Sequence, residues 1–120
     1  MHPPYFEISL IKKNIEILPT DASIDDTLHD FGNEGDAWVD TKLTNVVSTP
    51  LTVIPDMIKQ ASSNYAAGRY LMRVKNFEGA KVLMEAAEKQ VADYVASQSA
   101  ELQHITMKVS AYKTSPLADE

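Results

Sequence analysis

The sequence predicts an all-α protein, built as a small bundle of about four helices with an extended, strand-like C-terminal segment. Two observations predict the helices. Apolar residues recur every three or four positions through most of residues 1–97, and prolines or capping residues separate these runs. The third observation is a change to strict alternation of apolar and polar residues after residue 97. We therefore expect a helical domain over residues 1–97 and an extended docking segment over residues 98–120.

Residues 6–18 predict the first helix, which Pro19 ends. One face of this helix carries Ile8, Ile11, Ile15 and Leu18. Residues 15–17 also alternate as a strand would, so both readings stay open for the end of this segment. A short acidic helix is expected next, over residues 23–32. Ser23 is placed to cap its N-terminus with Asp26 three residues on, and Gly32 is placed to end it.

Residues 33–35 predict a loop, after which a second apolar run begins at Asp36. The inward residues of that run are Val39, Leu43, Val46 and Val47, with Trp38 beside them. Trp38 is more typical of a core residue than of a ligand platform. Pro50 stops the run, because a residue before proline avoids the helical region.

The next segment predicts a long helix from Pro55 to about Lys75, followed by another that Asn76 caps. The inner face of the first of these helices carries Ile54, Ile58, Ala61, Tyr65, Gly68 and Met72. The inner face of the second carries Ala80, Leu83, Ala87, Val91 and Tyr94. Because the loop between them is short, we expect a long antiparallel hairpin over residues 55–97. Gly68 costs about 1 kcal/mol in a helix interior, so it predicts close helix packing, within the domain or between subunits.

The C-terminal segment alternates apolar and polar residues with a period of two. A single strand leaves its own backbone groups without partners, so this segment is expected to add to the sheet edge of another protein. The residues predicted to bind that partner are Ile105, Met107, Val109 and Tyr112.

The net charge of −6 is concentrated in residues 21–40, which hold seven carboxylates and no lysine or arginine. Such a chain does not attract nucleic acid by itself, since phosphate binding depends on accumulated positive charge. The position of Arg69 and Arg73 allows two interpretations. In the first, they complement the negative end of a helix dipole, and in the second, they pair with the acidic segment of a neighbouring subunit. The second reading defines a possible subunit interface of Gly68, Arg69, Arg73, Asp25, Asp26 and Asp30.

Few residues of this chain match a catalytic or metal-binding pattern. Asp25 and His29 are four apart on one helix face and are conceivable metal ligands, but a third ligand is missing. The acidic stretch lacks the order of a calcium loop, and the four glycines form no phosphate loop. We therefore predict no enzymatic activity, no cofactor and no metal. With no cysteine, no signal peptide and no apolar run of about 18 residues, a soluble, unexported protein without membrane contact is expected.

The order of these parts resembles the head–tail connector adaptor family of tailed bacteriophages and related viruses. The resemblance covers residues 5–97. It rests on the aromatic-led start Tyr5-Phe-Glu-Ile-Ser, on Ile24-Asp-Asp with Leu28, and on Pro50-Leu followed by Ile54-Pro-Asp-Met-Ile-Lys-Gln-Ala61 at the opening of the hairpin.

The resemblance implies a helical bundle that forms a ring, usually dodecameric, beneath the portal in the neck of the virion. Its implied partners are the portal protein, neighbouring adaptor subunits and a tail or stopper protein, and assembly would take place in the host cytoplasm. DNA would pass through the channel without specific binding, as negative walls allow. The isolated chain is expected to be monomeric or weakly associated. Two other classes stay open: a stand-alone helical protein-interaction module, and a small enzyme that uses carboxylates or a metal.

Overall fold

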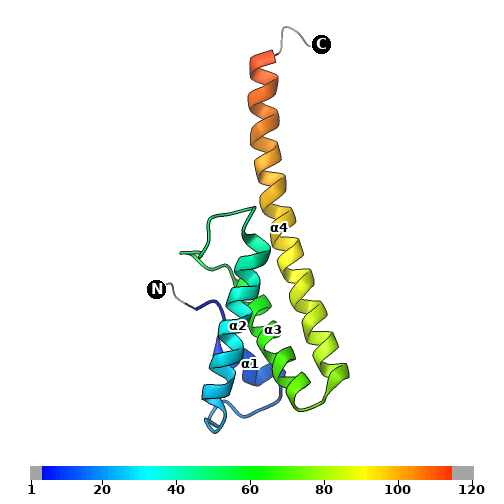
Figure 1. Ribbon diagram of the computed structural model, residues 1–120. Helices are drawn as coiled ribbons and strands as arrows, with labels where there is room; N and C mark the ends of the chain where they lie inside the picture. The colour runs from blue at the N-terminus through cyan, green and yellow to red at the C-terminus, as the bar shows by residue number, and fades with distance from the viewer. Residues whose placement is uncertain (1–3, 115–120) are drawn as a thin grey trace.

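The structure is organised around a long helical hairpin, against which two further helices pack (Figure 1). It is a computed structural model that describes the backbone of residues 4–114 and the side chains of residues 4–98. Over residues 4–114 the chain forms four helices and no strand, which confirms the predicted all-α class. The helices are α1 (Ile8–Asn14), α2 (Asp25–Leu43), α3 (Asp56–Arg73) and α4 (Phe77–Thr114).

The turn of the hairpin is closed by backbone hydrogen bonds around Lys75. This residue adopts a left-handed conformation with φ 67°. The N–H of Asn76 donates to the carbonyl of Leu71 at 2.8 Å, and the N–H of Lys75 donates to Met72 at 3.0 Å, which is a Schellman motif. The Asn76 side chain then accepts a hydrogen bond from the N–H of Gly79 at 3.0 Å, as predicted for the cap of α4.

Small residues let α3 and α4 approach each other closely. A Cβ atom added at Gly68 would lie 2.8 Å from Sδ of Met84 and 3.3 Å from the carbonyl of Ala80, both on α4. The close packing that Gly68 predicts is therefore made within one chain. On the same interface the Asn64 amide donates to the side chain of Gln90 at 3.0 Å.

The predicted loop at residues 33–35 is wrong, because α2 is continuous through it. The glycines that suggested a break instead allow close contact with neighbouring segments. A Cβ added at Gly32 would lie 2.5 Å from the Phe6 ring, and one at Gly35 would lie 2.6 Å from the backbone oxygen of Ser62. Packing against these neighbours therefore offsets the low helix propensity of glycine.

The start of α2 and the end of α1 also differ from expectation. Ser23 does not cap α2. Its N–H donates to the side chain of Asp21 at 2.9 Å, and Ile24 holds the cap position without a side-chain bond. The first helix ends at Asn14, before the residues that also read as a strand.

Two apolar clusters form the core, one against the first half of α3 and one against its second half. The first contains Tyr5, Val39, Leu43, Leu51, Ile58, Ala61 and Val91, with Trp38, Tyr94 and Val95 packed against it. The second contains Phe6, Ile11, Leu28, Ala66 and Ala67, with Leu83 packed against it. Adjacent residues of the N-terminal segment thus enter different clusters, and the segment joins them.

The extended backbone predicted from residue 98 is also corrected, because α4 continues as a helix to Thr114. A lone strand leaves its backbone groups unpaired, whereas each added helical residue pairs its N–H within the segment. Good helix formers such as Ala100, Glu101 and Leu102 favour this outcome. The predicted domain boundary between residues 97 and 98 therefore falls inside one helix. Residues 115–120 lie outside the described residues.

We call residues 98–114 of α4 the arm. Figure 1 shows the arm standing clear of α1, α2 and α3, which gives a molecule with its longest dimension at 66 Å. None of the helices in residues 4–114 combines the length and the apolar character that a bilayer span requires.

Gly35→Ala tests the close approach of α2 to α3. Alanine in a helix interior normally stabilises by about 1 kcal/mol relative to glycine. Here the new methyl would meet the backbone of Ser62, so we expect the free energy of unfolding to fall by about 1–3 kcal/mol. Urea denaturation measures the change. Asn33→Ala, at an exposed position of the same helix, is the control and should be neutral or slightly stabilising. A Gly35→Ala protein more stable than wild type would contradict the packing.

Candidate docking surfaces

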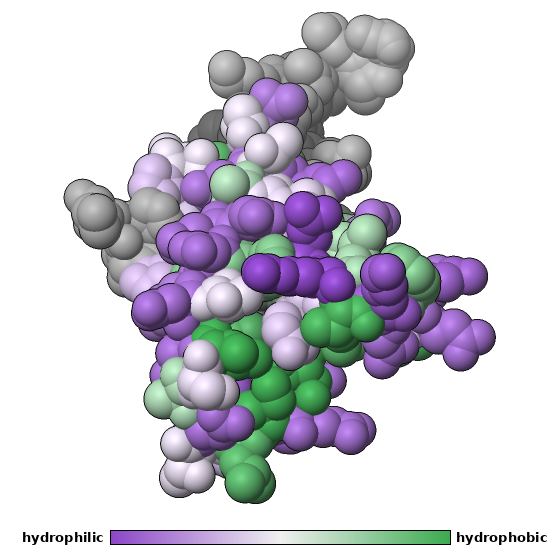
Figure 2. All heavy atoms as spheres, turned by 60° about the horizontal axis from the view of Figure 1, so that its bottom comes forward, coloured by the Kyte–Doolittle hydropathy of each residue, from purple (hydrophilic) through white to green (hydrophobic). Residues whose placement is uncertain are grey.

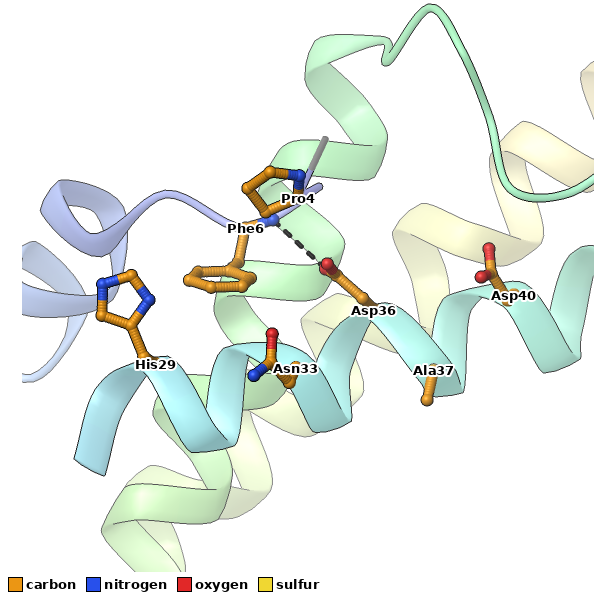
Figure 3. Close-up of a pocket in the computed structure, with 7 residues that line it drawn as sticks. All are labelled: Pro4, Phe6, His29, Asn33, Asp36, Ala37 and Asp40. Carbon is orange, nitrogen blue, oxygen red and sulfur yellow. Dashed lines mark hydrogen bonds between the residues drawn. The ribbon is translucent and has the colours of Figure 1, made fainter. Parts of the chain in front are cut away.

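The N-terminal segment is held on the bundle by the buried carboxylate of Asp36. Both of its oxygens accept the N–H of Tyr5, at 3.1 and 3.2 Å, and Oδ1 also accepts the N–H of Phe6 at 3.3 Å. The Ser62 hydroxyl on α3 donates to the same oxygen at 2.7 Å. Figure 3 shows the Asp36 side chain directed from α2 toward the backbone of Phe6. One carboxylate thus joins the N-terminal segment, α2 and α3.

The Tyr5 side chain extends this anchor to the loop that precedes α3. Its ring is fully buried, and its hydroxyl donates to Asp40 at 2.6 Å while accepting the N–H of Leu51 at 2.8 Å. Burial, together with the hydrogen bond to Asp40, raises the pKa of Tyr5 from 10.0 to about 12. The phenol is therefore held neutral.

A groove of about 520 Å³ lies beside this anchor, between the N-terminal segment and α2 (Figure 3). The residues that line it are Pro4, Phe6, His29, Asn33, Asp36, Ala37 and Asp40. Its two carboxylates already bind the N-terminal segment, and the ring of His29 packs edge-on against Phe6 at 5.5 Å. The polar and aromatic groups that line this groove thus serve to hold the N-terminal segment on α2.

The conceivable metal ligands of α2 are not gathered into a site. An oxygen of Asp25 lies 2.8 Å from the ammonium of Lys12, which also donates to the carbonyl of Pro19 at 3.2 Å. Among the described residues, no group of three or more histidine or carboxylate side chains is placed to hold a metal ion.

The chain matches no protein-family model, no curated protein and no solved structure.

A second groove, of about 290 Å³, runs between α2 and α4. It is lined by Trp38, Lys42, Glu88, Val91, Ala92 and Val95, and we call it the Trp38 groove. The indole stacks on Tyr65 with ring centres 4.7 Å apart, and the Lys42 ammonium lies 5.8 Å from the centre of the indole ring. Trp38 is thus part core residue, as predicted, and part wall of an apolar groove with a charge of each sign at its rim.

A third surface lies at the closed end of the hairpin. Val74, Phe77 and Val82 are 50%, 62% and 65% exposed. Val82 also lines a hollow of about 370 Å³ together with Leu71 and Leu83. Figure 2, in which the bottom of Figure 1 comes forward, shows apolar residues gathered at this end. We call Leu71, Val74, Phe77, Val82 and Leu83 the turn-end patch.

Three of the residues proposed for a subunit interface make contacts within the chain. The Arg69 guanidinium donates to Glu34 on α2 at 3.1 Å, Gly68 packs against α4, and Asp25 pairs with Lys12. Arg69 was expected to pair with the acidic segment of a neighbouring subunit. In the structure it pairs with the acidic segment of its own chain. Arg73, Asp26 and Asp30 lie exposed at the surface.

The residues proposed for tail docking lie in the arm, whose backbone is helical. Positions 105, 107 and 109 share one side of a strand, but in a helix residues two apart lie on different sides. Positions 105, 109 and 112 instead follow helical spacing. Positions 105, 107 and 109 therefore do not share one side of the arm. The role of Ile105, Met107, Val109 and Tyr112 as a partner-binding set remains a proposal.

The spacing of apolar residues does not predict the anchor made by Asp36 and Tyr5, because it places Asp36 at the start of a second helix. A signal was present, because Leu28, Gly32, Asp36, Val39 and Leu43 fall on one helical face. A carboxylate on an otherwise apolar and small-residue face indicates a buried acceptor.

Tyr5→Phe tests the anchor. Loss of the hydroxyl leaves the N–H of Leu51 and the carboxylate of Asp40 without this partner, so stability at pH 7 should fall by about 1–3 kcal/mol. Because the pKa of Tyr5 is raised to about 12, the unfolded state loses its proton first as the pH rises above 10.0. The free energy of unfolding should therefore fall between pH 10.0 and about 12.

Urea denaturation of wild type and Tyr5→Phe across pH 7 to 12 measures both effects. Lysines and the other tyrosines titrate in the same range, but they contribute equally to the pH dependence of both proteins, so their contribution cancels in the difference. The gap in stability between the two proteins should narrow as the pH rises toward 12. A gap that stays constant would contradict the buried, neutral phenol.

Proposed function

We propose that this chain is a structural virion protein, a head–tail connector adaptor that forms a ring beneath the portal. In this role the ring extends the DNA channel and joins the head to the tail. The observation that carries the proposal is the elongated shape of the molecule, with a projecting helix at one end and exposed apolar residues at the other. Figure 1 shows the arm extending from one end and the turn between α3 and α4 at the other, and the residues of the turn-end patch lie around that turn.

A connector must hold two different partners at once, so its contact surfaces must lie far apart. The arm offers a long helix to a partner, a mode in which an apolar helical face fits a groove. The turn-end patch offers large apolar side chains such as Phe77 to a second partner. We assign the arm to the portal and the turn-end patch to the tail or stopper protein.

The charge of the chain is compatible with a DNA channel. The net charge is −6, and Asp26 and Asp30 are exposed on α2. A ring of such subunits repels phosphate groups and lets DNA pass without sticking. This is the reason why an acidic protein suits the proposed position in the virion neck.

A stand-alone protein-interaction module is the second candidate. The Trp38 groove favours it, because this apolar groove is complete within one copy of the chain and requires no ring. The two candidates differ in their response to a portal. An adaptor binds a portal as many copies, whereas a module ignores it.

Removal of residues 98–120 should abolish binding to the portal while leaving the bundle intact. The described core residues of α4 end at Val95, so the thermal midpoint should change by no more than a few degrees. The measurement is capture of the full and shortened chains on purified portal rings encoded in the same genome, followed by light scattering and electron microscopy.

The full chain should decorate each portal with a ring of copies. Portal, capsid and tail genes should also lie beside its own gene. A shortened chain that still forms rings on the portal would refute the role of the arm. A full chain that ignores the portal, in a genome without neighbouring portal and tail genes, would refute the adaptor.

Phe77→Glu should act at the opposite end of the molecule. Phe77 is 62% exposed, so the change should leave the free energy of unfolding within about 0.5 kcal/mol of wild type. Rings should form on the portal as in wild type, but their joining to purified tails should be lost. The matched control is Lys81→Glu, an exposed change on α4 outside the patch. Tail joining that survives Phe77→Glu together with Val82→Glu would contradict the assignment of the patch.

A further inference from the structure

The arm carries on a line of residues that begins inside the bundle. From Val91 onward, α4 has residues spaced alternately four and three apart, namely Val91, Val95, Gln98, Leu102, Ile105, Val109 and Tyr112. This spacing is the heptad repeat of a coiled coil. Val91 belongs to the first apolar cluster and Val95 packs against it. The line therefore starts on the packed face of α4 and continues along the arm, where Figure 1 shows no other helix of the chain.

The charges that flank this line favour one orientation of two arms. Glu101 and Lys108 hold the position before a line residue, and Lys113 holds the position after one. In a parallel pair, Lys108 would face Lys113 of the partner subunit, which is a repulsive contact. In an antiparallel pair, Glu101 faces Lys108 of the partner subunit, and the two-fold axis repeats this attraction.

We propose that the free chain forms an antiparallel two-fold dimer in which the arms of two copies pair along this line. The register set by the Glu101 and Lys108 contacts places Leu102 opposite Ile105 of the partner subunit. The same register places Val95 opposite Tyr112 of the partner subunit. Gln98 faces Val109 of the partner subunit, and a polar residue in a core layer fixes register at a cost in stability.

A groove on the bundle independently supports this register. The Trp38 groove lies against Val91 and Val95 of α4, at the level where the register brings the end of the partner's arm. It has about 290 Å³ of space, an apolar wall from Trp38 and the charges of Lys42 and Glu88 at its rim. The register brings position 112 of the partner subunit, a tyrosine in the sequence, to the level of this groove. The arm of the partner subunit thus covers both the line of residues on α4 and the groove beside it.

The dimer is a state of the chain before assembly and is separate from the proposed function. A two-fold antiparallel pair does not belong to a ring in which all subunits point the same way. The dimer and the portal therefore compete for the arm, and the dimer holds the free chain back from premature assembly. Because the paired line is short and includes Gln98, the dimer is weak and reversible.

Charge exchange at the arm tests the dimer and its orientation. Sedimentation equilibrium of the full chain at low salt gives the dissociation constant of wild type, Glu101→Lys, Lys108→Glu and the double variant. Each single change puts like charges together twice, so the dissociation constant should rise on the order of tenfold. The double variant restores both attractions and should return to within about twofold of wild type. An equimolar mixture of the two single variants should also associate as wild type does.

Two further variants separate the paired line from the rest of α4. Asp93→Lys makes the same charge change as Glu101→Lys at an exposed position off the line, and it should leave the dissociation constant unchanged. Ile105→Lys should raise the dissociation constant by more than tenfold. Circular dichroism of each variant checks that helix content is kept.

Three results would overturn the proposal. The first is a wild-type chain that stays monomeric at about 1 mM. The second is a dimer that Ile105→Lys does not weaken. The third is a Lys108→Glu chain that associates more tightly, which is the result expected of parallel arms. Portal capture is measured separately, so a dimer that never binds a portal would refute the adaptor and leave the dimer standing.

Discussion

The Asp36 carboxylate is the interaction on which the rest of the bundle depends. Burying a carboxylate is costly unless hydrogen bonds replace the lost water. Here two backbone N–H groups of the N-terminal segment and the Ser62 hydroxyl of α3 supply them. The requirement to satisfy one charge thus fixes three segments that are far apart in sequence. It also determines where Tyr5 and Phe6 enter the two apolar clusters.

Close approach is the second constraint, and glycine makes it possible. Gly32 and Gly35 bring α2 to the N-terminal segment and to α3, while Gly68 brings α3 to α4. Each glycine lowers helix propensity locally but removes a methyl group that would separate the helices. Gly35 approaches Ser62, the same residue whose hydroxyl donates to Asp36 at 2.7 Å. The polar anchor and the small-residue contacts are therefore one arrangement.

The parts of the fold that local chemistry determines were predicted well. The cap at Asn76, the stop before the hairpin turn and most of the inner faces of α3 and α4 follow from residue type and spacing. Met72, which was expected on the inner face of α3, is the exception, since it is 41% exposed. The continuity of α2 was not predicted, because a glycine that breaks a helix and a glycine that allows close packing look the same in one sequence. Only the position of Phe6 and Ser62 in space distinguishes them. The arm was predicted to be extended because its residues fit a period of two as well as a heptad repeat. The helical pattern is preferred only if helix α4 is known to continue into this segment.

The unbroken length of α4 has a mechanical consequence. Residues 77–114 form one helix, so the bundle and the arm share a single axis with no hinge between them. Each residue of a helix advances it by about 1.5 Å and turns it by about 100°. One residue inserted near position 97 would therefore swing the whole bundle by about 100° relative to whatever grips the arm. The number of residues in α4 thus determines the rotation of the bundle about the helix axis. It therefore sets the direction in which the exposed carboxylates of α2, such as Asp26 and Asp30, point once the arm is bound.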